Sequence, residues 1–175
     1  LNQGIKSLPD KLERATWLNY IRCHDDIGLG FDDNDILLAG YDPVPHRRFL
    51  IDYFTGEFKD SAARGRPFGH NAKTGDARIS GSLASLVGLE AALEKGDPQE
   101  IDDAIKVIIL MHGMIMSFGG IPLLYYGDEI GTTNDYRYVE DERKSGDTRW
   151  MHRPTFDWDK AELRNKPNTT ENRIF

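Results

Sequence analysis

The stretch Gly120-Ile121-Pro122-Leu123-Leu124-Tyr125-Tyr126-Gly127-Asp128-Glu129 decides the fold. It contains a short apolar strand that has a glycine on each side and is followed by two acids. Residues 121–126 are almost continuously apolar, as in a strand that is buried on both faces of a parallel sheet. Pro122 lies near the start of this run, where the missing N–H costs least. A second strand is predicted at residues 17–22, which are rich in aromatic and β-branched side chains. It leads into Cys23-His24-Asp25-Asp26, so both predicted strands are followed by acids.

A helix is predicted directly before the strand at 121–126. Asp97 is placed to cap it, Pro98 takes its first position, and Glu100 lies where a capping box has its glutamate. Apolar residues then recur at steps of three and four, and Gly119-Gly120 ends the helix. A helix, two glycines and a buried strand are typical of α/β units with parallel strands.

The connection between the two strands is longer than a simple crossover. Roughly 100 residues separate the strands, whereas a whole βαβ unit takes roughly 30. We therefore divide the chain into a first-strand region (1–26), an inserted subdomain (27–83), the helix with the second strand (84–131) and a long polar loop (132–175). Within the insertion we expect a helix in residues 39–58, a Gly-rich loop over 64–78 and a further helix over 82–93. No internal repeat is evident, and a loop as long as the last region is usually functional.

The composition excludes several classes of protein. Lys and Arg number 22 against 29 Asp and Glu, so the net charge of −7 argues against a nucleic-acid partner. The longest apolar stretches are far too short for a membrane span. The single cysteine, Cys23, excludes an internal disulfide and a cysteine-based zinc site, and we expect no metal and no cofactor. The chain starts at Leu1 without a signal-peptide pattern, so we interpret it as a piece of a longer protein, with a cytoplasmic location favoured over a secreted one.

The acids that follow the two strands are the first candidate site. In parallel α/β folds, ligand-binding groups gather at the carboxyl ends of strands, so Asp25, Asp26, Asp128 and Glu129 are expected at one rim. The alternatives are that Asp25 or Asp26 caps a turn and that Glu129 is an exposed turn residue. Residues 32–35, another acidic run, lack the Gly and the closing Glu of a calcium loop and are interpreted as a solvated turn.

Three arginines are the second candidate group. Arg47, Arg78 and Arg149 carry the side chain best suited to bidentate contacts with carboxylates or neighbouring hydroxyls, and Trp150 offers a surface on which a sugar could stack. The alternative for each arginine is a surface ion pair.

Residues 19–26 and 120–129 resemble the seventh and eighth barrel strands of the α-amylase superfamily, glycoside hydrolase family thirteen. The doubled aspartate followed by Ile27-Gly28 is similar to the amylosucrase-like branch, as are Pro45-His46-Arg47-Arg48-Phe49-Leu50, Thr74-Gly75-Asp76-Ala77-Arg78-Ile79-Ser80-Gly81 and Asp147-Thr148-Arg149-Trp150-Met151-His152-Arg153-Pro154. The resemblance covers nearly the whole chain in order. It implies an α/β fold, namely a partial (β/α)8 TIM barrel with about two parallel strands and a largely helical inserted subdomain.

The resemblance also implies roles for individual residues. His24 and Asp25 match the pair at the donor subsite, where the aspartate is the catalytic residue that stabilises an oxocarbenium-like transition state. Arg149 matches an arginine that pairs with an aspartate from early in the barrel and closes the donor side into a pocket for one glucose. That aspartate would lie outside this chain, so we expect no buried acid of the chain itself opposite Arg149.

On the acceptor side, the resemblance implies that Asp26 and Arg78 grip the second sugar, which is fructose in sucrose, and that Arg47 binds further out. Retaining glycoside chemistry needs a nucleophile and an acid roughly 5 Å apart. The family's nucleophile lies in an Arg-x-Asp motif, which does not occur in this sequence.

The sequence therefore predicts part of the catalytic domain of a retaining α-glucosidic enzyme, of the amylosucrase type, that builds α-glucan from sucrose and releases fructose. Sucrose hydrolase or α-amylase activity is the alternative within the superfamily, and an inactive carbohydrate-binding or interaction fragment is the alternative from another class. The expected partners are sucrose, α-glucan or an oligosaccharide, and the rest of the barrel. The isolated chain is expected to be catalytically silent and to self-associate through open strand edges.

Overall fold

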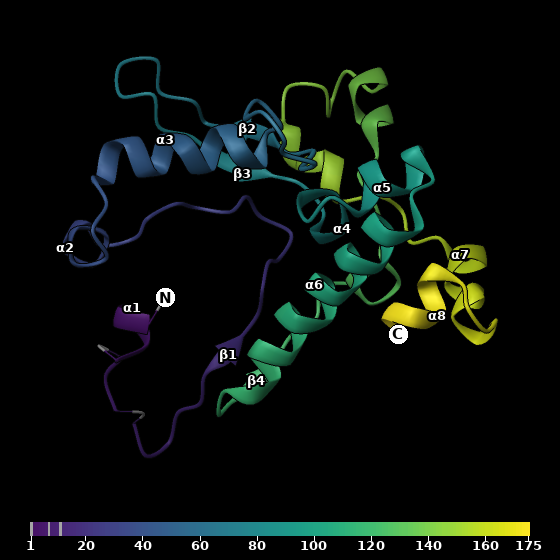
Figure 1. Cartoon of the computed structure of the whole chain (residues 1–175), viewed down its shortest axis with the longest axis horizontal. Helices are drawn as coiled ribbons and strands as arrows, with labels where there is room; N and C mark the ends of the chain where they lie inside the picture. The colour runs from purple at the N-terminus through teal and green to yellow at the C-terminus, as the bar shows by residue number, and fades with distance from the viewer. Residues whose placement is uncertain (1, 7, 11) are drawn as a thin grey trace.

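The computed structural model describes residues 2–6, 8–10 and 12–175 and is a mixed α/β chain in which helices predominate (Figure 1). The elements in chain order are α1 (Asn2–Lys6), β1 (Leu18–Asn19), α2 (Asp33–Leu38), α3 (Pro43–Phe54), β2 (Arg66–Phe68), β3 (Arg78–Ser80), α4 (Leu83–Leu86), α5 (Leu89–Lys95), α6 (Pro98–Ser117), β4 (Ile121–Pro122), η1 (Asp128–Ile130), η2 (Tyr136–Glu140), η3 (Thr148–His152), α7 (Trp158–Glu162), η4 (Leu163–Asn165) and α8 (Thr170–Ile174), where η marks a 3-10 helix. Across the described ranges no helix is both long and apolar enough to cross a membrane.

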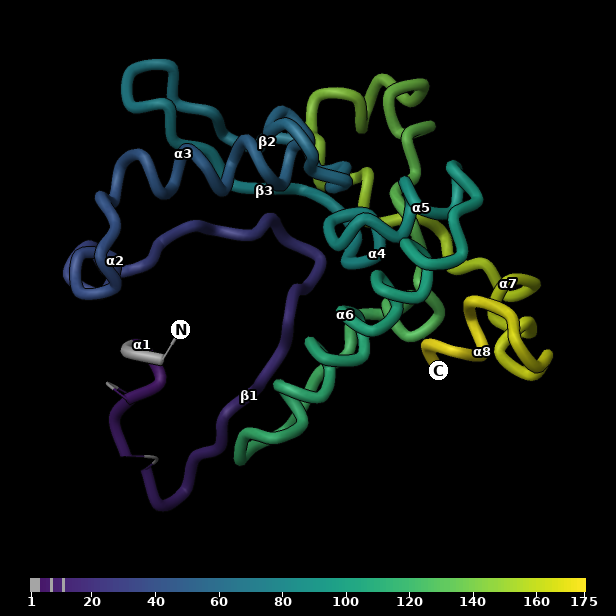
Figure 2. The backbone as a smooth tube through the Cα atoms, viewed as in Figure 1, coloured from purple at the N-terminus to yellow at the C-terminus, as the bar shows by residue number. Residues whose placement is uncertain are grey.

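The two predicted strands pair with each other in parallel, as the sequence indicates. Leu18 of β1 lies opposite Ile121 of β4, and the two segments run side by side in Figures 1 and 2. The backbone N–H of Ile121 donates to the carbonyl of Trp17 at 2.9 Å, and the N–H of Leu123 donates to that of Asn19 at 2.8 Å. Each strand is only two residues long, because no further strand in the described part of the chain pairs with either of them.

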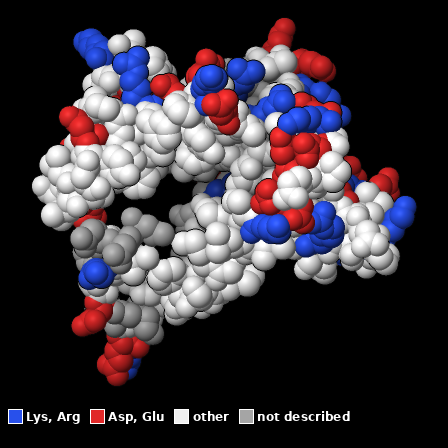
Figure 3. Space-filling view, in the orientation of Figure 1, with Lys and Arg blue, Asp and Glu red and all other residues white. Residues whose placement is uncertain are grey.

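The prediction that residues 121–126 are buried on both faces is wrong for this chain. Ile121 is 50% exposed and Leu124 is 43% exposed. No described element covers this apolar surface, and Figure 3 shows an uncharged area around α6 and β4 on the viewed face. The segment has the apolar composition of a strand that is buried on both faces, but in the described part of the chain most of its side chains are exposed.

Helix α6 is confirmed with its predicted cap and buried face. The carboxylate of Asp97 accepts the backbone N–H groups of Gln99 at 2.9 Å and Glu100 at 3.2 Å. The Glu100 carboxylate binds Lys95 instead of completing a capping box. The inward face of the helix packs against α4 and α5 in the main core, which consists of Leu83, Ala84, Leu89, Ala104, Ile105 and Ile108.

The inserted segment contains more regular structure than the sequence predicts. Its helix α3 starts at Pro43, because Asp42 caps it by accepting the N–H of Val44 at 3.1 Å. The predicted solvated turn at 32–35 is instead the cap and first turn of α2, since Asp32 accepts the N–H of Asn34 at 2.8 Å. The predicted loop at 64–78 contains β2 and leads into β3, and the two strands form an antiparallel pair.

The helix predicted over 82–93 is divided in two at Gly88. This glycine has a φ of 88°, which side-chain-bearing residues rarely adopt, and a Cβ there would lie 2.9 Å from the Cβ of Ala62. The sequence therefore continues from α4 into α5 with a change of direction. Leu83 and Ala84 of α4 and Leu89 of α5 are still buried in the core that faces α6, whereas Leu86 is buried against the inserted segment and Leu93 is exposed.

Candidate functional site

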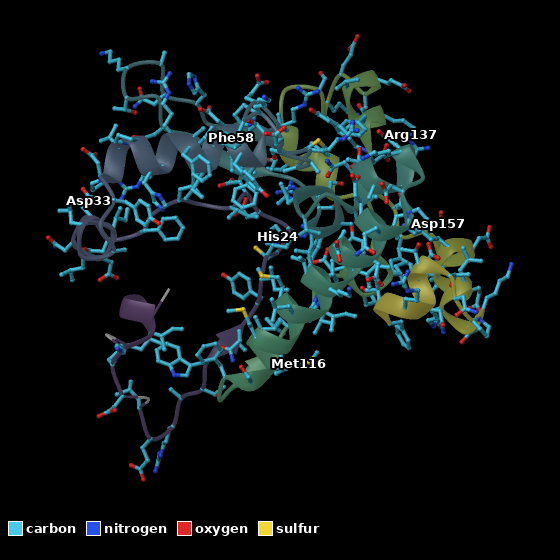
Figure 4. The ribbon with its side chains drawn as sticks, viewed as in Figure 1. His24, Asp33, Phe58, Met116, Arg137 and Asp157 are labelled. Atoms are coloured by element: carbon cyan, nitrogen blue, oxygen red, sulfur yellow. The ribbon has the colours of Figure 1, made fainter. Side chains whose placement is uncertain are left out.

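The candidate site begins at residue 24, five residues after the end of β1, and it gathers residues from three distant segments. Residues 24–26 contact Arg78, the first residue of strand β3, on one side and η3 on the other. Figure 4 shows His24 between the α3 half of the molecule and helix α6. Asp25, Asp26, Arg78 and Arg149, which the sequence singled out, are brought together here.

Arg149 is the centre of this cluster. Its guanidinium lies 2.8 Å from the carboxylate of Asp147, 2.6 Å from that of Asp25 and 3.9 Å from the buried carboxylate of Asp26. The expectation that no buried acid of this chain faces Arg149 is therefore wrong. The physical reason is local, because Asp147 caps η3 and binds the Arg149 side chain, which turns its remaining nitrogen, Nη1, toward Asp25.

The ion pairs in the cluster keep the acids charged. The hydrogen bond from Arg149 lowers the pKa of Asp25, although desolvation opposes the shift, and a hydrogen bond from the same arginine lowers the pKa of Asp147. The two acids correspondingly raise the pKa of Arg149. Asp25 itself is half-exposed, so its carboxylate is both charged and accessible from solvent.

Asp26 and Arg78 form the second pair of the cluster, at 3.1 Å. The Asp26 side chain is only 5% exposed, and its Oδ1 atom has no hydrogen-bond donor among the described residues. The ring of Phe68 lies against two cations, with the guanidinium of Arg149 at 4.5 Å and that of Arg78 at 4.9 Å from its centre. No helix in the described part of the chain begins directly after either aspartate, so neither caps a helix, although the Asp25 carboxylate accepts a hydrogen bond from the backbone N–H of Asp26 as in a local turn.

Arg47 is the one predicted arginine that lies away from the ion-pair cluster. It binds Asp33 and donates from Nε to the carbonyl oxygen of Leu29 at 3.1 Å. Arg47 and Arg78 nevertheless line the same cavity, of about 570 Å³, together with Asn71 and Asp76. The two arginines assigned to the acceptor side thus share one polar cavity beside the cluster.

The acids after the second strand have a different environment from those after the first. Asp128 is 2% exposed and lies 3.1 Å from Arg22, whose side chain is 3% exposed. Burial raises the pKa of Asp128, and the positive charge of Arg22 opposes that rise. Glu129 is half-buried rather than exposed, and its Oε2 atom has no hydrogen-bond partner in the described part of the chain. Asp128 therefore joins the segment after β1 to the turn after β4 instead of facing a ligand.

His152 is a site residue that sequence reasoning missed. It is 1% exposed, its Nδ1 accepts the N–H of Gly81 at 3.0 Å, and its Nε2 lies 3.1 Å from the carbonyl oxygen of His24. Nothing in its sequence context distinguishes it from a core histidine. Burial lowers its pKa to about 4.

The low pKa of His152 predicts a pH-dependent stability. The unfolded state binds the proton with a pKa near 6.5 and the folded state with one of about 4, so the free energy of unfolding should be constant above pH 6.5 and fall by about 3 kcal/mol between pH 6.5 and 4. Urea unfolding of the wild type and of His152→Gln at pH 7 and pH 4.5 measures this difference. The Gln variant should lose most of the pH dependence, and an unchanged dependence would contradict the assignment.

A short repeat also escaped sequence reasoning. In Asp135-x-Arg137, Asp141-x-Arg143 and Asp147-x-Arg149, each carboxylate accepts the N–H of the arginine two residues later and binds its guanidinium. The three Asp-x-Arg pairs follow one another at intervals of six residues, and this regular spacing is the signal from which the sequence could have indicated the repeat. Two of these arginines are more than 75% exposed, and only Arg149 is directed at the site.

The arrangement offers carboxylates and guanidinium groups around a half-exposed cluster and an adjoining polar cavity, which are the groups that bind neighbouring hydroxyls. Among the described residues, no three His, Cys, Asp or Glu side chains are grouped so that they could hold a metal ion. No model of a protein family matches this chain.

Proposed function

We propose that this chain is part of the catalytic domain of a retaining α-glucosidic enzyme of the amylosucrase type, which transfers glucose from sucrose to α-glucan and releases fructose. In this proposal β1 and β4 are the seventh and eighth strands of a (β/α)8 barrel. The longer protein that would carry the remaining strands is called the parent enzyme below. The isolated chain has no Arg-x-Asp motif, so the proposal assigns it no turnover of its own.

One observation carries the proposal. The site residues that the resemblance implies at positions 25, 26, 78 and 149 form one cluster connected by ion pairs, in which Asp25 and Asp26 lie six and seven residues after the last residue of β1. They come from three segments separated by more than 50 residues each. The carboxyl end of a parallel strand is where barrel enzymes place their catalytic groups.

The chemistry of Asp25 agrees with a role in the transition state. Glycosidic cleavage develops positive charge on the sugar ring, and a fixed carboxylate nearby stabilises that charge. The low pKa of Asp25 keeps it ionised at neutral pH, and its half-exposed position leaves one side open to a ligand. The nucleophile and the acid would come from the rest of the parent enzyme.

The exposed apolar surface supports the same proposal. Ile121, Leu123 and Leu124 are each more than 40% exposed, and so are Ile109 and Leu110 of α6. In the parent enzyme these residues would pack against the neighbouring barrel strands and helices.

The proposal is tested by assaying the parent enzyme with sucrose and with starch. We expect fructose release from sucrose, with glucose released in smaller amount than fructose because most of it enters α-glucan. Equal release of glucose and fructose would indicate a sucrose hydrolase, and cleavage of starch alone would indicate an α-amylase. A folded parent enzyme that acts on neither sugar would contradict the proposal.

A carbohydrate-binding role without catalysis is the second candidate, and one observation favours it. The Asp25 carboxylate is bound to Arg149 at 2.6 Å and lies 3.8 Å from Arg153, so part of its charge is already balanced. A binding module would retain sucrose or maltooligosaccharides without consuming them. Calorimetry with these sugars, combined with the product assay, separates the two roles.

Arg78 and Asp26 are expected to control what happens after the donor bond is cleaved. Because they would hold the acceptor sugar, Arg78→Ala or Asp26→Asn should change the ratio of hydrolysis, sucrose isomers and polymer by more than about threefold, a difference of roughly 0.7 kcal/mol in competing barriers. Product chromatography at equal sucrose conversion measures this ratio. Arg137→Ala, which removes an exposed arginine outside the cluster, is the control. Unchanged product ratios in both variants would leave the pair with a structural role only.

A further inference from the structure

His152 connects the three segments that build the candidate site. It belongs to η3, accepts a hydrogen bond from Gly81 directly after β3, and contacts the carbonyl of His24, five residues after the end of β1. Each contact is made by a different ring nitrogen. The ring is almost completely buried, so it lies between these segments and not on their surface.

The two contacts determine the protonation state of the ring. A backbone N–H such as that of Gly81 only donates, so Nδ1 must carry a lone pair. A backbone carbonyl such as that of His24 only accepts, so Nε2 must carry the hydrogen. His152 is therefore neutral at pH 7, in agreement with the effect of burial on its pKa.

Each segment that His152 holds carries a member of the ion-pair cluster. His24 immediately precedes Asp25, Gly81 follows the strand that begins with Arg78, and Arg149 lies one turn before His152 in η3. Arg153 adds a second hydrogen bond to the same His24 carbonyl, at 2.6 Å. A change at position 152 would therefore alter the distances between Asp25, Arg78 and Arg149 without touching any of them.

We propose that His152 is a positioning residue, whose two hydrogen bonds hold Asp25 against Arg149 and fix the Arg78 strand beside them. The claim that this positioning supports catalysis rests on the function proposed above. The claim that His152 holds Asp25, Arg78 and Arg149 in place concerns only contacts within this chain.

The geometric half is tested by titrating the Asp25 carboxyl group by NMR in the 175-residue chain. His152→Ala and His152→Leu remove both hydrogen bonds, and Leu keeps most of the side-chain volume. His152→Gln retains one acceptor and one donor. Met151→Ala is the matched control, because Met151 is fully buried in the same turn and its side chain makes no hydrogen bond in the described structure.

We expect the pKa of Asp25 to rise toward the ordinary value of an aspartate in the Ala and Leu variants and to remain low in the Gln variant. Met151→Ala should lower the unfolding temperature and leave the titration of Asp25 unchanged. An Asp25 titration in a folded Ala or Leu variant that matches the wild type would overturn the proposal. So would a shift in Met151→Ala equal to that in the His152 variants, because the effect would then follow stability alone. If neither the Ala nor the Leu variant folds, the Gln variant decides. A folded Gln variant in which the pKa of Asp25 is raised would overturn the proposal. A folded Gln variant in which the pKa of Asp25 is as low as in the wild type would support it.

The catalytic half is tested in the parent enzyme. His152→Leu should lower kcat for sucrose by about tenfold or more with a smaller change in KM, and His152→Gln should restore most of the rate. If the wild-type parent enzyme does not act on sucrose while the Asp25 pKa moves as expected, the proposed function fails and the positioning role stands. If wild-type sucrose turnover is normal and His152→Leu leaves it unchanged, the positioning role in catalysis fails.

Discussion

Asp25→Asn in the parent enzyme is expected to lower kcat for sucrose by about a hundredfold or more, a barrier increase of roughly 2.7 kcal/mol. The substitution keeps the size and most of the hydrogen bonding of the side chain but removes the negative charge. That charge would face the positive charge that develops on the glucosyl ring only in the transition state, so the loss should appear in kcat more than in KM.

The measurement is the initial rate of fructose release at saturating sucrose, with circular dichroism to show that the variant is folded. Asp141→Asn is the matched control, because Asp141 makes the same Asp-x-Arg contact as Asp147 but lies outside the cluster. The control should keep nearly the full rate. An Asp25→Asn enzyme that retains more than about a tenth of the wild-type rate would exclude the role assigned to Asp25.

Arg22→Met is expected to cost about 3–5 kcal/mol of unfolding free energy, because it would leave one partner of a buried ion pair uncompensated. Arg22 donates to Asp128 at 3.1 Å and to the carbonyl of Cys23 at 3.1 Å, and its guanidinium lies 4.5 Å from the centre of the Tyr125 ring. Its removal would leave the buried Asp128 without a counter-charge. The pKa of Asp128, already raised by burial, would rise further, and part of the cost would be the uptake of a proton.

Urea unfolding of the chain measures this cost, and a double variant separates its causes. Because two apolar side chains need no counter-charge, Arg22→Met combined with Asp128→Leu should recover more than half of the lost stability. Arg137→Met removes an exposed ion pair and should cost less than about 1 kcal/mol. A loss below that value for Arg22→Met, or no recovery in the double variant, would contradict the importance of the buried pair.

The elements that the sequence predicted well have strong local signals. Helix α6 follows from Asp97, Pro98 and a regular apolar face, and all three features act within a few residues of one another. The parallel pairing of β1 with β4 follows from apolar residues, acids and glycines at the strand ends. The resemblance groups Asp26 with Arg78, and these two residues form an ion pair, whereas it does not predict the contacts of Arg149 with Asp25 and Asp26.

The features that the sequence did not predict depend on distant contacts or on very short elements. Strands β2 and β3 have three residues each and include Arg, Pro and Ser, so no alternation of apolar and polar residues marks them. The role of His152 depends on Gly81 and His24, which are 71 and 128 residues away. The acid opposite Arg149 was expected from another part of the protein, because the sequence does not reveal that Asp147 turns the side chain toward Asp25.

The measurement that tests the central claim most directly is a crystal structure of the parent enzyme with Asp25→Asn, soaked with sucrose so that the uncleaved sugar is retained. We predict that the fructosyl hydroxyls lie within hydrogen-bond distance of Asp26 and Arg78, and that the glucosyl ring lies beside residue 25 and His24. Sucrose bound elsewhere, with the Asp26–Arg78 pair unchanged from its 3.1 Å contact, would contradict the claim that this cluster is the sugar site.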